Sequence, residues 1–120
     1  MNLSKQPKIK SLKNRNEIKD LLANGRKVFN KYGIIFIKQD SSLKNNMSAV
    51  LIKKKCGNAV KRNYIKRIVR NFIREHSEQV GKYNRTLFLY LFKGSVNYED
   101  MESVYLNALN KYEKSSTHFY

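Results

Sequence analysis

The segment from Asn58 to Glu75 constrains the fold of this chain more than any other. At about 100° per residue, its apolar and basic side chains separate onto opposite sides of a helix. The predicted buried stripe comprises Tyr64, Ile65, Ile68, Val69 and Phe72. The predicted polar face comprises Arg62, Asn63, Lys66, Arg67, Arg70 and Arg74. We therefore expect a helix that packs on a core with one side and presents basic residues on the other.

Strand-like segments flank this helix. Met47 to Lys53 precedes it, and the nearly continuous apolar run from Thr86 to Phe92 follows it, as expected of a central strand covered on both faces. A helix between two such strands predicts a βαβ unit with the strands parallel. Cys56-Gly57-Asn58 is predicted to form the turn into the helix.

The remaining elements follow from caps and from β-branched runs. Asn14 is the predicted cap of a helix from Arg15 to Asn24 that Gly25 closes, and residues 28–29 and 32–39 are predicted strands. Asn97 with Asp100 begins a last helix. The predicted order is α-β-β-β-α-β-α, a single α/β domain of the α+β sandwich type. We expect residues 1–11 to form a basic flexible arm, residues 12–114 the domain, and residues 115–120 a short tail.

The charge is large and uneven. The chain has 25 Lys and Arg against 9 Asp and Glu, and residues 1–74 hold 20 of the basic residues but only three acidic ones. Solubility requires a net charge of only about 2 to 8, far below the +16 of this chain. Nine basic residues and no acidic residue lie between Lys53 and Arg74. This pattern predicts a polyanionic partner, and nucleic acid is the most suitable one.

Catalysis by the chain's own side chains is not indicated. The only histidines are His76 and His118, and no Cys and His cluster has zinc spacing. Cys56 has no evident His or acidic partner, which favours a structural or incidental thiol. The apolar runs are too short to cross a bilayer, so we expect a soluble, cytoplasmic protein without a membrane partner, and no protein partner is evident.

A longer motif carries a resemblance. The segment Lys55-Cys56-Gly57-Asn58-Ala59-Val60-Lys61-Arg62-Asn63-Tyr64-Ile65-Lys66-Arg67 closely resembles the signature of the bacterial ribonuclease P protein component, K-x-G-N-A-V-x-R-N-x-x-K-R. The resemblance implies a small α/β domain with an unusual left-handed βαβ crossover. It also implies a partner, a large catalytic RNA, and a role in the ribonucleoprotein endonuclease that removes the 5′ leader of precursor tRNA. In that enzyme the RNA supplies the active site, and Mg²⁺ is bound mainly by the RNA.

The resemblance and the charge pattern together predict an RNA-binding surface and no catalytic or metal-binding residue in the protein. The signature positions match the basic turn and the RNA-binding helix, and the flanking polar residues extend them. The predicted RNA-binding residues are Lys53, Lys54, Lys55, Asn58, Arg62, Asn63, Lys66, Arg67, Arg70 and Arg74.

The resemblance also implies a cleft for the single-stranded leader, where the chain departs from the pattern. Phe36 stands at a strand position that is often tyrosine, whereas Ile18 and Leu22 replace aromatic residues of the first helix. All three are also compatible with plain core packing, and for Ile18 and Leu22 the two interpretations are equally balanced. Tyr64 stands where the signature usually has a second arginine, and on the helical projection it falls at the border between the basic and the apolar side.

Two other functions are compatible with the composition. A ribosome-associated or assembly RNA-binding protein without enzymatic activity fits equally well, and only the signature separates it from a ribonuclease P subunit. A DNA-binding helix-turn-helix is disfavoured because no partner helix closely precedes Asn58.

Overall fold

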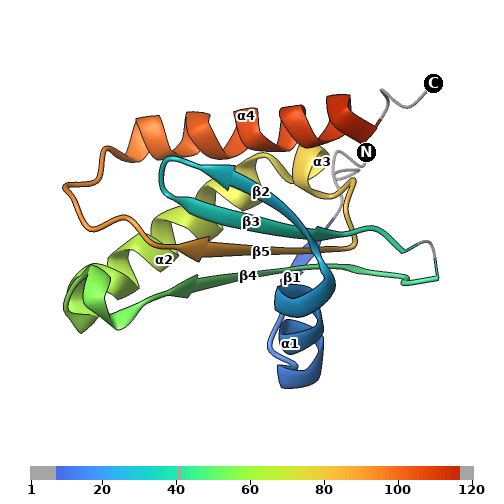
Figure 1. Ribbon diagram of the computed structural model, residues 1–120, viewed down its shortest axis with the longest axis horizontal. Helices are drawn as coiled ribbons and strands as arrows, with labels where there is room; N and C mark the ends of the chain where they lie inside the picture. Colours follow the sequence, from blue (N-terminus) through green and yellow to red (C-terminus); the bar gives the residue numbers. More distant parts are fainter. Residues whose placement is uncertain (1–7, 41, 117–120) are drawn as a thin grey trace, which may run out of the picture.

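A computed structural model describes residues 8–40 and 42–116, with side chains to Glu113, and a five-stranded sheet lies at its centre (Figure 1). The strands are β1 (Ile9–Ser11), β2 (Arg26–Asn30), β3 (Gly33–Lys38), β4 (Asn46–Ile52) and β5 (Arg85–Tyr90). Their order across the sheet is β1-β4-β5-β3-β2. Strand β4 is parallel to both β1 and β5, whereas β3 is antiparallel to β5 and β2. The parallel β4–β5 pair confirms the predicted βαβ unit, and the left-handed crossover stays a prediction.

Helices cover both faces of the sheet. They are α1 (Arg15–Asn24), a 3₁₀ turn (Lys54–Cys56), α2 (Ala59–Glu75), α3 (Ser77–Val80) and α4 (Tyr98–Ser116). Helices α2 and α4 contribute to one core cluster and α1 to another, on opposite faces of the sheet (Figure 1). Among the described residues, no helix combines the length and apolar character that a membrane span requires.

The predicted caps form as expected. The Oδ1 of Asn14 accepts a hydrogen bond from the Glu17 N–H at 3.0 Å, and the Oδ1 of Asn97 accepts one from the Asp100 N–H at the same distance. The Gly25 N–H donates to the Leu21 carbonyl at 2.9 Å and closes α1. These ends were predictable because each cap satisfies a backbone group within four residues of its own position.

The structure corrects the predicted boundaries at both ends. Ile9–Ser11, assigned to the flexible arm, forms β1 and pairs with β4, and Leu12 behind it is buried. A strand of three residues is too short to show a detectable alternation of apolar and polar side chains. It is ordered because it pairs with β4 at the edge of the sheet. Helix α4 continues to Ser116, two residues beyond the predicted end of the domain, and α3 was not predicted. The rest of the arm, residues 1–7, and the tail residues 117–120, including His118, lie outside the described residues.

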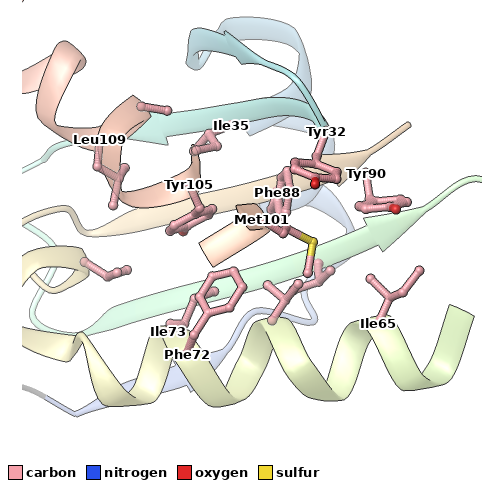
Figure 2. Close-up of a cluster of buried hydrophobic side chains, with 14 of the residues drawn as sticks. Tyr32, Ile35, Ile65, Phe72, Ile73, Phe88, Tyr90, Met101, Tyr105 and Leu109 are labelled. Carbon is pink, nitrogen blue, oxygen red and sulfur yellow. The ribbon is translucent and has the colours of Figure 1, made fainter. Parts of the chain in front are cut away.

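The larger core cluster lies between the sheet and helices α2 and α4 (Figure 2). Phe72 of α2 and Tyr105 of α4 have ring centroids 5.3 Å apart, and Phe88 of β5 lies 5.4 Å from Tyr105. Ile65, Val69, Phe72 and Ile73 are the buried residues of α2. The apolar stripe predicted for this helix is therefore confirmed at three of its members, while Ile68 is half-buried and Tyr64 is exposed.

A smaller cluster lies under α1 on the opposite face. It comprises Leu12, Leu21, Phe36, Ala49 and Leu87. An ion pair between a buried arginine and a partly exposed glutamate joins α1 to the sheet next to this cluster, with Arg85 Nε 3.1 Å from Glu17 Oε1. The Nη1 group of Arg85 also donates to the carbonyls of Asn45 and Asn84, each at 2.8 Å. These bonds fix α1 against the face of the sheet that is opposite α2.

Candidate nucleic-acid interface

Three residues shape the turn that precedes α2. Gly57 has φ +157° and ψ 175°, a backbone conformation that is essentially restricted to glycine. The Oδ1 of Asn58 accepts a hydrogen bond from the Lys61 N–H at 2.9 Å, and Arg62 Nε donates to the Gly57 carbonyl at 3.1 Å. The Gly-Asn dipeptide and Arg62 of the motif therefore have a structural role in addition to any contact with RNA.

The residues predicted to bind RNA lie along the 3₁₀ turn and α2 as one surface, called here the α2 basic surface. All of them are exposed or half-buried. The surface comprises Lys53, Lys54, Lys55, Asn58, Arg62, Asn63, Lys66, Arg67, Arg70 and Arg74. Because the opposite side of α2 is packed into the larger core cluster, these polar groups are held on a rigid element.

The cations of this surface are not neutralised by the protein. Within residues 8–40 and 42–113, no Lys or Arg of the α2 basic surface forms an ion pair. The Lys and Arg residues that do form ion pairs are Lys31, Lys38, Lys82 and Arg85. No acidic residue occurs from position 41 to position 74. The surface therefore presents a concentrated positive potential to solvent, which favours a polyanion.

A groove of about 490 Å³ extends the surface toward β1. Arg70 and Arg74 of α2 line one side of it, and Lys8 and Lys10 line the other, with Ser48 of β4 between them. No acidic side chain of the described residues lines this groove. Sequence reasoning missed the contribution of Lys8 and Lys10 because it assigned both to a flexible arm. The sequence offers no clear signal for β1, because the strand has only three residues.

Comparison with known proteins identifies the family of this chain. Residues 6–113 match the protein-family model described as Ribonuclease P.

The chain belongs to the ribonuclease P protein family.

Individual relatives agree with this assignment. The chain is 31% identical over 96 residues to the ribonuclease P protein component of Syntrophomonas wolfei, covering 79% of this chain and 80% of that protein. It is 32% identical over 71 residues to the ribonuclease P protein component of Macrococcus caseolyticus, covering 59% of this chain and 62% of that protein, which is less than two thirds of its length. The solved structure of the Staphylococcus aureus RNase P protein superimposes with a TM-score of 0.74 at 18% identity, covering 86% of this chain and 94% of that one, and shows the same fold.

The residues predicted to form a leader cleft lie in the smaller core cluster. Phe36 is only 3% exposed, and Ile18 and Leu22 of α1 are half-buried against the same cluster. Phe36 is buried because it pairs with Leu87 at the centre of the sheet, on the face that α1 covers. Its ring therefore does not present the open stacking face that the sequence suggested. Leader binding by these three residues stays a prediction.

Tyr64 was grouped with the buried stripe of α2, which is wrong, whereas its predicted place at the border with the basic side is confirmed. Its side chain is 45% exposed, because α2 turns Ile65, Val69 and Phe72 toward the sheet and leaves position 64 at the margin. The structure thus places an aromatic ring on the α2 basic surface at the position where the family signature usually has arginine.

Among the residues that the structure describes, one group of possible metal ligands lies beyond the far end of the basic surface. The ligand atoms of Glu75, His76 and Glu102 lie within 4.8 Å of one another, and His76 Nε2 is 2.6 Å from Glu102 Oε2. The His76–Glu102 contact connects the end of α2 to α4. An imidazole nitrogen is a poor match for Mg²⁺, which prefers oxygen ligands in octahedral geometry. We therefore assign no Mg²⁺ site to these residues.

Proposed function

We propose that the chain binds the catalytic RNA of ribonuclease P and the 5′ leader of precursor tRNA, and so assists endonucleolytic removal of the leader. The observation that carries the proposal is the α2 basic surface, whose cations have no ion-pair partners among the described residues. Such cations displace counterions from RNA phosphates and so contribute directly to binding free energy. Membership of the family favours this function over that of a ribosome-associated protein.

The chemistry of cleavage is assigned to the RNA partner. Mg²⁺-assisted hydrolysis requires ligands gathered around the ion, and the α2 basic surface has no carboxylate. We propose that Mg²⁺ is held mainly by the RNA. The protein's part is electrostatic, because its cations reduce the repulsion between the catalytic RNA and the substrate.

The experiment compares three mixtures under a Mg²⁺ titration: protein alone, catalytic RNA alone, and both together with precursor tRNA. The protein alone is expected not to cleave. The complex is expected to cleave at the leader junction at lower Mg²⁺ than the RNA needs by itself. A variant carrying Lys66→Ala and Arg70→Ala is the matched control, and it should need more Mg²⁺ than the unaltered complex. Cleavage by nuclease-free protein without RNA, or no effect of protein on the Mg²⁺ requirement, would contradict the proposal.

A further inference from the structure

An apolar patch interrupts the α2 basic surface at the start of the helix. Three large hydrophobic side chains are exposed among the described residues, and two of them, Val60 and Tyr64, lie one helical turn apart on α2. Val60 is 79% exposed and Tyr64 is 45% exposed. The third, Phe29, lies on the edge strand β2. Exposed apolar side chains among cations indicate a binding surface for a partner that contacts both the apolar and the basic groups.

The Tyr64 ring is held in a defined orientation. It meets the ring of Tyr98, at the start of α4, edge to face, with centroids 5.4 Å apart and planes at 88°. The guanidinium carbon of Arg67, one turn further along α2, lies 5.7 Å from the Tyr64 centroid. The aromatic pair connects α2 to α4, so the ring loses little conformational freedom when a ligand binds.

A fixed aromatic ring beside unpaired cations is the arrangement that recognises unpaired nucleotides. The ring stacks with a base, and neighbouring basic side chains contact the phosphates on either side. Tyr64 has no cationic group, so it cannot form the ion pair with a phosphate that the usual signature arginine can form at this position. The absence of acidic residues from position 41 to position 74 favours RNA over an ordinary protein surface as the partner of the patch.

We propose that Tyr64, flanked by Val60 and Arg67, stacks with an unpaired nucleobase of the RNA partner. The inference rests on the proposed function, because it names the part of the RNA that the start of α2 contacts. Tyr64 would recognise the RNA by stacking on a base, whereas the usual signature arginine would recognise it through its positive charge.

The chain contains no tryptophan, which permits a direct test. Tyr64→Trp places a single indole at the patch, and a stacked adenine quenches indole fluorescence. The probe is an oligoadenylate of about 10 nucleotides, compared with an abasic strand of the same length. The matched control is Phe29→Trp, which places the indole at the exposed aromatic position outside the α2 basic surface. Quenching is expected only for Tyr64→Trp with oligoadenylate.

Affinity measurements separate stacking from charge. Tyr64→Phe should bind oligoadenylate as tightly as the unaltered chain, and Tyr64→Ala about 5-fold to 100-fold more weakly, as expected for the loss of one base stack. The salt dependence of binding should be the same for all three, because no cation is removed. Melting curves of each variant establish that the fold is retained.

The outcomes distinguish the inference from the proposed function. If Tyr64→Ala binds oligoadenylate as tightly as the unaltered chain and Tyr64→Trp is not quenched, the patch serves another partner, such as a protein, and the inference is wrong while RNA binding by the cations stands. If the unaltered chain binds neither oligoadenylate nor the catalytic RNA, both are wrong.

Discussion

Cations of the same type have different roles in two regions of this molecule. Arg85 lies at the edge of the smaller core cluster, its side chain is 8% exposed, and it bonds to Glu17 and to two backbone carbonyls. Arg67 and Arg70 lie on α2, are exposed, and have no ion-pair partner among the described residues. The difference is one of surroundings, since the side chains are chemically identical.

The comparison indicates what each group of cations contributes. A desolvated charge is tolerated only when its partners are in place, so Arg85 is coupled to the folded structure. Exposed charges contribute little to stability, even when they are paired. Apart from Arg62, which bonds to the Gly57 carbonyl, the cations of the α2 basic surface can therefore be used for binding with almost no cost to the fold.

The largest expected effect is on the buried side of α2. Ile65→Ala should lower the free energy of unfolding by about 2 to 5 kcal/mol, because Ile65 is fully buried and its truncation leaves a cavity. Arg67→Ala, on the exposed side of the same helix, is the control and should change stability by less than about 0.5 kcal/mol. Urea unfolding measures both. Equal losses of unfolding free energy in Ile65→Ala and Arg67→Ala would contradict the division of α2 into a side that packs on the core and a side that binds.

Arg85 should show the next largest loss. Arg85→Met keeps most of the side-chain volume but removes the donor to Glu17 and to the Asn45 carbonyl, while the Asn84 carbonyl still accepts from the Met47 N–H. We expect unfolding free energy to fall by about 2 to 3 kcal/mol, less than for a fully buried pair because Glu17 is partly exposed. Lys66→Met, on the α2 basic surface, should unfold like the unaltered chain. A stability loss in Lys66→Met as large as that in Arg85→Met would break the comparison.

Removal of an α2 cation should affect RNA binding and leave folding nearly unchanged. Arg70→Ala should weaken binding to the catalytic RNA and flatten the slope of log affinity against log salt by about 0.7 to 0.9, the amount expected for one lost phosphate contact. Lys31→Ala is the control, because Lys31 pairs with Asp100 and lies outside the surface. Filter binding at several salt concentrations measures the slope. The same change in both variants would show that RNA binding depends on net charge alone.

The smallest effect concerns a paired surface carboxylate. Hydrogen bonds from Lys31 and Tyr32 hold the pKa of Asp100 below its ordinary value of 3.8. Stability from this carboxylate is therefore present above that pH and is lost as the pH falls through the lower, folded-state pKa. Asp100→Asn should make unfolding free energy less dependent on pH below 3.8.

The control for this variant is Glu99→Gln, which removes a neighbouring negative charge from the same first turn of α4. Denaturant unfolding at a series of acidic pH values compares the two. If the unfolding free energy of Asp100→Asn depends on acidic pH as it does in the unaltered chain, the Lys31–Asp100 pair does not contribute to stability.

Much of the candidate site was predictable because it lies in one continuous segment. The buried positions Ile65, Val69 and Phe72 and the basic positions between them all depend on the 3.6-residue period of a single helix. The burial predicted for Tyr64 was wrong because this residue lies at the border between the apolar and the basic side of α2. A small rotation of α2 against the sheet decides whether such a residue is covered.

The sequence by itself determined the local elements, the caps and the separation of charge, because each depends on residues a few positions apart. Only the tertiary structure decided that Ile9–Ser11 joins β4, that α1 covers Phe36, and that Arg85 pairs with Glu17, 68 positions earlier. These outcomes depend on contacts between distant segments. Local propensity carries no information about which segments will meet, and the free energy of burial and pairing selects among them.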